Sequence, residues 1–146
     1  MSILIKNSQK SIRLNQQRIR KDLGKALRLL GLQTSELSIM FVGNRLMTRL
    51  NSLYRGFNRT TDVLSFPLDN GRASGPTNLL GDIVVCIPKA VSQSKEYDVP
   101  FYDELLRLLI HGLLHLIGYD HEKNASQKAK MEKKERDLLN AVQEMD

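Results

Sequence analysis

The sequence predicts one α+β domain that spans residues 1–146, and three observations support this prediction. A chain of 146 residues has room for one hydrophobic core and little room for a second. With 41% hydrophobic and 26% charged residues, its composition suits a globular protein and excludes a collagen-like or largely disordered chain. Apolar residues recur at strand and helix spacings in the order strand, helix, strand, helix, strand, strand, followed by further helices.

The first predicted elements are a short strand over residues 2–5 and a long helix that ends at Gly31. Asn7, Ser8 and Ser11 are candidate N-caps of that helix, because their side-chain oxygens can accept its first free backbone N–H groups. Apolar residues follow at steps of three, four and seven: Ile12, Ile19, Leu23, Leu27 and Leu30. Basic residues fill the other faces, so we expect this helix to carry much of the positive charge.

A second strand and helix are predicted between residues 36 and 56. Residues 36–42 alternate well enough for a strand with one apolar side. The residues expected on that side are Leu37, Ile39 and Phe41. Asn44 is a candidate N-cap for a helix that runs to Gly56.

Two more strands and three helices follow. Residues 62–66 favour a strand that Pro67 stops, and the Gly, Pro and Ser residues between 69 and 78 predict an exposed loop. Residues 80–87 have the strongest strand pattern, rich in Ile and Val and ended by Pro88, so we expect this strand to be central. The predicted helices cover residues 89–97, 101 to about 117, and 126–142.

The sequence indicates a cytoplasmic protein without a membrane span. Cys86 is the single cysteine, so the chain can form no internal disulfide. Residues 1–11 lack the apolar run of a secretory signal. The longest apolar stretch, residues 105–117, is too short to cross a bilayer and is interrupted by Arg107 and two histidines.

The charge is unevenly distributed along the chain, whose formal net charge is +6. Residues 1–72 hold 13 Lys and Arg against 4 Asp and Glu, a net +9, whereas residues 73–146 hold 9 against 12, a net −3. A basic half favours a polyanionic partner, nucleic acid first, because it neutralises phosphates and steers their approach. The alternative is an ordinary solvated helix face.

All three histidines of the chain lie within eleven residues, from His111 through His115 to His121. Residues four apart lie above one another on a helix, so the first two can direct ring nitrogens at one cation about 2 Å away. Gly118 can adopt a positive φ, end the helix and let the third histidine close on the same point. Three neutral imidazoles leave a tetrahedral metal one open position, as in catalytic sites.

Two other interpretations of these histidines stay open. Histidines on an apolar helix are often ordinary core residues, although burying unpaired imidazoles beside Leu113, Leu114 and Leu116 would cost about 1–3 kcal/mol for each unsatisfied group. A structural metal would prefer a fourth protein ligand, which Asp120 or Glu122 can supply.

The spacing also equals the HExxHxxGxxH pattern of metzincin proteases, with Gly118 in the matching place. The position of the catalytic glutamate is Gly112 here, and glycine can transfer no proton. A metalloprotease is therefore disfavoured. Catalysis would need another base, or a substrate with its own nucleophile, such as RNA with its 2′-hydroxyl beside the scissile phosphate.

The segment HGLLHLIGYDH, residues 111–121, resembles the signature of the bacterial YbeY family. Further segments agree with that family in the same order. They are YRG at 54–56, TDVLSFP at 61–67, GDI at 81–83, and Met131 with Glu135. The resemblance covers residues 50–139, whereas the first 49 residues match mainly in the order of their elements.

This resemblance implies a small mixed four-stranded sheet flanked by helices, a zincin-like fold with its three-histidine metal site at the end of a long helix. It implies a metal-dependent hydrolase, a single-strand-specific endoribonuclease of 16S rRNA 3′-end maturation and ribosome quality control. One zinc ion is expected on His111, His115 and His121, with other divalent metals as alternatives. His111 and Arg55 are the expected catalytic residues, since a planar guanidinium suits phosphate oxygens. The expected partners are single-stranded RNA, the small ribosomal subunit and its assembly factors.

A rival interpretation is a noncatalytic RNA- or ribosome-binding assembly factor whose metal only holds the last helix in place. Other polar residues have less specific expected roles. We expect Asp82, within an apolar strand, to cap a turn or support the site, and Thr61 and Asp62 to form a turn. Asp120 is expected to orient a ligating histidine or form a turn, and Tyr119 to pack in the core or stack on a base.

Overall fold

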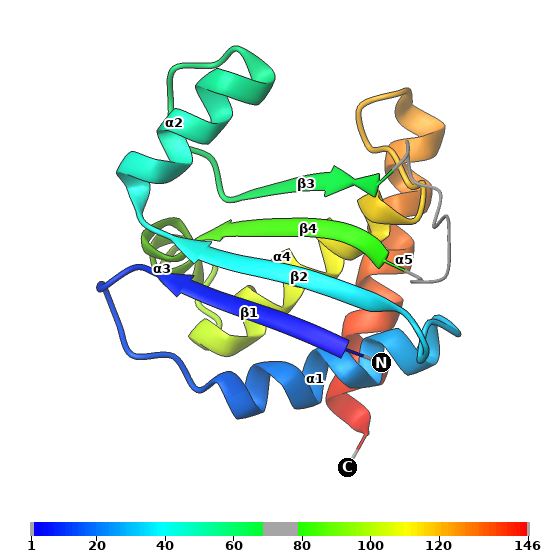
Figure 1. The fold of residues 1–146 in the computed structure, drawn as a ribbon. Helices are drawn as coiled ribbons and strands as arrows, with labels where there is room; N and C mark the ends of the chain where they lie inside the picture. The colour runs from blue at the N-terminus through cyan, green and yellow to red at the C-terminus, as the bar shows by residue number, and fades with distance from the viewer. Residues whose placement is uncertain (1, 69–78, 146) are drawn as a thin grey trace.

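The computed structural model describes residues 2–68 and 79–145 (Figure 1). Its elements follow the predicted order of strands and helices. They are β1 (Ser2–Ser8), α1 (Gln16–Leu29), β2 (Glu36–Val42), α2 (Asn44–Arg55), β3 (Val63–Pro67), β4 (Leu79–Cys86), α3 (Ile87–Glu96), α4 (Phe101–Leu116) and α5 (Ala125–Glu144). The loop predicted over residues 69–78 lies outside the described residues.

The four strands form one mixed sheet in the order β1-β2-β4-β3. β1 and β4 each run parallel to β2, whereas β3 is antiparallel to β4, with Val63 opposite Val85. The expected α+β fold with a small mixed four-stranded sheet is therefore confirmed. β4 has a neighbour on each side, as its sequence predicts, and β3 lies at an edge of the sheet.

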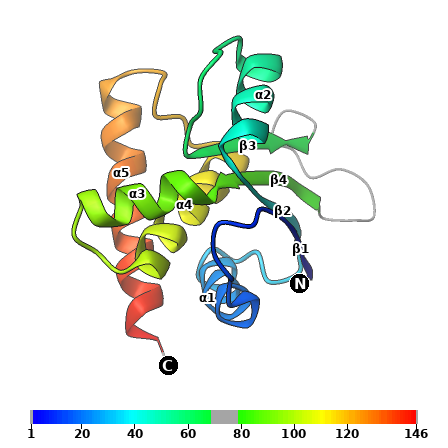
Figure 2. The same ribbon diagram turned by 90° about the vertical axis from the view of Figure 1, so that its left-hand side faces the viewer.

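The main core lies between one face of the sheet and the layer formed by α1, α3, α4 and α5 (Figure 2). Alternation along β2 directs Leu37, Ile39 and Phe41 to this face, where each is at most 1% exposed. α4 lies against β3 and β4 and is surrounded by the other helices of the layer. Burial of these apolar side chains supplies most of the stabilisation and fixes the position of α4.

α4 contains the longest apolar stretch of the sequence, and that stretch is part of the core. Its Leu105, Leu109 and Leu113 are each at most 1% exposed. Among the helices of the described residues, none is both long enough and apolar enough to cross a membrane.

α2 covers the opposite face of the sheet near β3 and β4 (Figure 2). Met47 is its fully buried apolar residue and packs in a second, smaller core against Val42, Leu64, Val84 and Cys86. This packing fixes α2 so that its last turn lies at the mouth of the cavity described below.

The start of α1 differs from the prediction. β1 continues to Ser8, and its Asn7 and Ser8 pair with β2, so these residues cap no helix. Ser11 lies in the connection that follows. α1 begins after Asn15, whose Oδ1 accepts a hydrogen bond of 3.1 Å from the backbone N–H of Arg18.

The N-cap of α2 also differs. The capping position is Gly43, and Asn44 is already the first residue of the helix. The Asn44 side chain instead accepts a hydrogen bond from the thiol of Cys86, with Sγ 3.2 Å from Oδ1. A tertiary contact to β4 has therefore replaced the local one.

Candidate metal centre

α4 ends in a turn that brings the third histidine back toward the first two. Gly118 has φ 109°, a conformation that favours glycine, and its N–H donates to the carbonyl of His115 at 3.1 Å. The N–H of Tyr119 donates to the carbonyl of Leu114 at 3.0 Å. These two bonds form a Schellman motif, the termination expected from the glycine. They reverse the chain so that His121 faces the side of α4 that carries His115.

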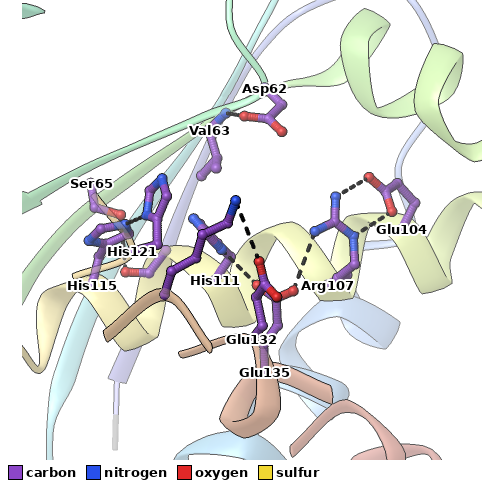
Figure 3. Close-up of polar contacts among 12 residues, drawn as sticks. Asp62, Val63, Ser65, Glu104, Arg107, His111, His115, His121, Glu132 and Glu135 are labelled. Carbon is purple, nitrogen blue, oxygen red and sulfur yellow. Dashed lines mark hydrogen bonds and ion pairs between the residues drawn. The ribbon is translucent and has the colours of Figure 1, made fainter. Parts of the chain in front are cut away.

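The three imidazoles converge on one point (Figure 3). The ring centroids of His111, His115 and His121 lie 4.8–5.1 Å from one another. One nitrogen from each ring can be chosen so that all three lie within 4.8 Å of one another. His115 Nε2 lies only 2.7 Å from His121 Nδ1. This group can hold a metal ion, because convergent ring nitrogens are the ligands that zinc and similar metals prefer.

The surroundings of His115 favour the neutral, metal-binding form of its ring. The pKa of His115 is lowered from 6.5 to about 4, mainly by burial and to a smaller extent by the neighbouring imidazoles of His111 and His121. Its ring is therefore neutral at neutral pH, and a neutral ring nitrogen has a lone pair for a metal.

Neither acidic residue considered as a fourth ligand joins the histidines. Asp120 Oδ1 accepts a 2.9 Å hydrogen bond from the N–H of Glu122, so Asp120 forms the turn. Glu122 Oε1 lies 2.8 Å from Arg55 Nη2 and 3.8 Å from His121 Nε2. Within the described residues, the group of potential ligands contains the three histidines alone. This donor set resembles a catalytic site more than a closed structural one.

Glu135 of α5 is a site residue for which the sequence predicts no role. Its Oε1 lies 2.7 Å from His111 Nδ1, on the outer side of the ring. A signal for it exists in the sequence, because Glu135 interrupts the apolar stripe of α5 formed by the buried Met131, Leu138 and Val142. An acidic residue in such a stripe indicates a buried polar partner.

The histidines line an open cavity of about 730 Å³. One wall is β3, from Val63 to Pro67, and another is the end of α2 with the loop that follows. Arg55 and Arg59 face the same cavity as the histidines, so the structure brings Arg55 and the expected ligands together. α1, the basic helix, contributes no residue to this cavity, and its charges lie elsewhere on the molecule.

Gly112 has a structural reason to be glycine. A Cβ atom there would lie 2.9 Å from Ile83 Cγ2 and 3.0 Å from Ser65 Oγ. The Ser65 hydroxyl also donates to the Gly112 carbonyl at 3.0 Å. α4 thus approaches the sheet too closely for a side chain at the position where a metzincin has its catalytic glutamate.

The remaining polar residues singled out in the sequence are not part of the metal group. Asp82 is exposed on β4 and does not line the cavity. Asp62 lines the cavity, and its Oδ1 accepts a 2.7 Å hydrogen bond from the N–H of Val63, a local contact at the start of β3. Tyr119 packs against the core and does not line the cavity.

The fold and the site together define a class of protein, an α+β domain in which three histidines at the end of a helix can hold a metal ion beside an arginine. The chain belongs to the endoribonuclease YbeY family, because the family model described as Endoribonuclease YbeY matches residues 4–143. Membership confirms the recognition made from the motifs and, with it, the expectation of an enzyme, an endoribonuclease.

Individual relatives are similar over nearly the whole chain. A protein named Endoribonuclease YbeY from Syntrophus aciditrophicus is 39% identical over 141 residues, which cover 95% of this chain and 88% of the relative. One of the same name from Finegoldia magna is 38% identical over 147 residues, covering 97% and 94%. The solution structure of TM1509 from Thermotoga maritima has a TM-score of 0.68 at 28% identity, covering 96% of this chain and 88% of that one.

Proposed function

We propose that this chain acts as one domain, residues 1–146, and cleaves single-stranded RNA with one zinc ion held by His111, His115 and His121. The observation that carries this proposal is the convergence of three imidazoles beside Arg55 in one open cavity. Family membership supports RNA as the substrate, since the relatives are named endoribonucleases.

The three histidines suit zinc because imidazole is one of its preferred ligands and three protein ligands are typical of its catalytic sites. A metal ion there would supply Lewis-acid chemistry at the scissile phosphate. Other divalent metals that accept imidazole are alternatives to zinc. Gly112 supplies no proton-transfer group, so a substrate whose own 2′-hydroxyl can act as nucleophile suits this site better than a peptide.

In this proposal, Arg55 holds the phosphate. Its guanidinium lies at the mouth of the cavity, 40% exposed, and pairs with the carboxylate of Glu122. A carboxylate and a phosphate present similar oxygen pairs to an arginine, so Glu122 marks where a phosphate can bind. A fixed positive charge there would stabilise negative charge that develops during phosphoryl transfer.

Two exposed aromatic residues, Tyr54 in the cavity lining and Phe57 beside Arg59, support a preference for single strands. Tyr54 is 62% exposed and packs edge-on against Phe66, with ring centroids 5.1 Å apart. Phe57 is 43% exposed, and the guanidinium of Arg59 lies 4.7 Å from its ring centroid. Unpaired bases stack on such surfaces, whereas the bases of a duplex are already stacked on each other.

The cellular role follows from the family resemblance. We place the cleavage in 16S rRNA 3′-end maturation and ribosome quality control in the cytoplasm, on the small ribosomal subunit and with its assembly factors. Net positive charge in residues 1–72 supports binding to ribosomal RNA outside the cavity.

An RNA-cleavage assay with and without a chelator tests the proposal. We expect the zinc-loaded protein to cut single-stranded RNA, to leave the same RNA intact when it is annealed to its complement, and to lose activity on chelation. His111→Ala should abolish cleavage while the melting temperature stays close to that of the metal-free protein. Cleavage of an unstructured polypeptide and not of RNA would instead indicate a metalloprotease. Absence of cleavage together with unfolding on chelation would favour the noncatalytic assembly factor.

A further inference from the structure

A polar network, formed by Glu104, Arg107 and Glu135, leads from the interior of the helical layer to His111 (Figure 3). It starts at Glu104 of α4, which is 1% exposed and receives two hydrogen bonds from Arg107, at 2.8 Å from Nε and 2.7 Å from Nη2. Gln93 of α3 donates a third, at 2.7 Å. Arg107 Nη1 then reaches across to α5, 3.5 Å from Glu135 Oε2. The polar network ends at the 2.7 Å contact between Glu135 Oε1 and His111 Nδ1.

Each residue of this polar network holds the next one in place. A buried carboxylate such as Glu104 requires a partner, and the two-pronged contact with Arg107 supplies it with a fixed geometry. The hydrogen bond with Glu104 raises the pKa of Arg107, so the guanidinium keeps its charge. Because two of its nitrogens are occupied by Glu104, the remaining one points at a defined place on α5. That place is the carboxylate of Glu135.

The contacts of Glu135 differ from those of its neighbour on the same helix. Glu135 is 14% exposed and has one oxygen toward Arg107 and the other toward His111. Glu132 is 58% exposed, and its ion pair is with Lys128 at 4.0 Å. Both residues have the same formal charge, but only the first contacts a histidine of the metal group.

We propose that Glu135, held by Arg107 and Glu104, is a positioning residue that fixes the tautomer and orientation of the His111 ring for metal binding. This inference rests on the proposed function, because it takes the three histidines as the ligands. A carboxylate can only accept a hydrogen bond, so the proton of a neutral His111 is on Nδ1. Nε2 then keeps its lone pair for the metal. Such a carboxylate contact also makes the imidazole a stronger ligand.

The same contacts keep Glu135 from becoming a ligand itself. With Oε1 on His111 and Oε2 directed at Arg107, neither oxygen is free to turn toward the point where the imidazoles converge. The arrangement strengthens the metal group without closing it, so a coordination position stays available to substrate.

Two measurements on purified protein test this role. NMR of ¹⁵N-histidine-labelled, metal-free protein reports which nitrogen of His111 carries the proton, and competition with a chromophoric chelator gives the zinc affinity. The variants are Glu135→Ala, which removes the contact, and Glu135→Gln, which keeps an acceptor but removes the charge. Glu132→Gln is the matched control, and Arg107→Lys tests whether the rest of the polar network supports Glu135. Circular dichroism and thermal melting establish that each variant is folded.

We expect His111 to be protonated at Nδ1 in the wild type and in Glu132→Gln, and to lose this preference in Glu135→Ala. Zinc affinity should fall about 10- to 100-fold in Glu135→Ala, less in Glu135→Gln and Arg107→Lys, and stay unchanged in the control. A folded Glu135→Ala protein with the wild-type tautomer and wild-type zinc affinity would overturn the positioning role. Failure of the wild type to bind zinc would contradict the proposed function instead, and the tautomer of the metal-free protein would still decide the role of Glu135.

Discussion

Arg55 and Glu122 face each other across the mouth of the cavity, 2.8 Å apart, with 40% and 59% of their side chains exposed. An ion pair this exposed is worth at most about 1 kcal/mol, because water and salt screen it. A phosphate can therefore replace Glu122 as the partner of Arg55 at little cost. The pair keeps the guanidinium oriented toward the cavity until substrate binds.

Replacing Arg55 tests the phosphate contact. Arg55→Lys keeps the charge but loses the planar fork, so we expect cleavage of single-stranded RNA to fall roughly 100-fold. Zinc content and melting temperature should not change, because Arg55 touches neither the metal group nor the core. Arg49→Ala, an exposed arginine on α2 outside the cavity, is the control and should keep full activity. Equal activity of Arg55→Lys and wild type would contradict the role.

The lowered pKa of His115 predicts how the stability of the metal-free protein depends on pH. In the unfolded chain this ring has a pKa near 6.5, and in the folded protein near 4, so between these values the unfolded state binds more protons. Stability therefore falls as the pH falls from 6.5 to 4, and the loss is complete below 4. Denaturant unfolding at several pH values, with a chelator present, measures this slope.

His115→Gln is the comparison for that pH profile. Its unfolding free energy should depend less on pH between 6.5 and 4 than that of the wild type, since the other titrating groups are common to both proteins. Parallel profiles for the two proteins would show that His115 is not shifted in the folded state.

Sequence reasoning at the level of single residues succeeded where the partners are close in the chain. His111, His115 and His121 were found because four-residue spacing and Gly118 are local signals. The contact of Glu135 with His111 joins two helices, and the apolar stripe around residue 135 indicates a polar partner without indicating which residue it is. Asp82 is exposed although it lies in a central strand, because such a strand need not be covered on both faces along its whole length.

At the scale of elements, the close packing of α4 on β3 and β4 decides where the histidines lie. Gly112 makes this approach possible because it has no side chain. A hydrogen bond from the Ser65 hydroxyl to the Gly112 carbonyl also holds the helix against β3. The helix cannot move outward without carrying His111 and His115 with it.

Gly112→Ala tests this packing. The added methyl group would meet Ile83 Cγ2 at 2.9 Å, in a part of the core where the neighbours are themselves packed. We expect the free energy of unfolding to fall by about 1–3 kcal/mol, as for other overpacked cores, measured by denaturant titration. Zinc affinity should also weaken as the histidines shift. If Gly112→Ala were as stable as the wild type, the helix and sheet would not be in such close contact.

Element boundaries show a limit of local reasoning. Asn7 and Ser8 are good capping residues by type, but pairing with β2 extends β1 through both of them, and Asn15 caps α1 instead. The Asn44 side chain likewise makes a tertiary contact, because it accepts a hydrogen bond from the thiol of Cys86 on β4. The order of the elements was predictable because hydrophobic periodicity records it, whereas the exact ends depend on tertiary contacts that the pattern does not contain.

At the scale of the whole molecule, the core is formed by apolar residues and not by the metal group. The main cluster joins the sheet to α1, α3, α4 and α5 through buried apolar residues, and the histidines lie at its margin. This arrangement predicts that the metal serves the site and that the fold persists without it.

Metal removal tests that prediction. We expect chelated protein to keep its far-ultraviolet circular dichroism and to unfold cooperatively. Zinc should stabilise it only by mass action, about 2.7 kcal/mol when free zinc is roughly a hundred times its Kd. Loss of cooperative unfolding on chelation would identify a structural metal and favour the assembly-factor alternative.

The central claim is that His111, His115 and His121 hold one metal ion and leave a coordination position open. The most direct measurement is a crystal structure of zinc-loaded protein with an anomalous map at the zinc edge. The account predicts one peak about 2.0–2.1 Å from a ring nitrogen of each histidine, with solvent in the remaining position. A fourth protein side chain on the ion, or rings that point away from it, would contradict the account.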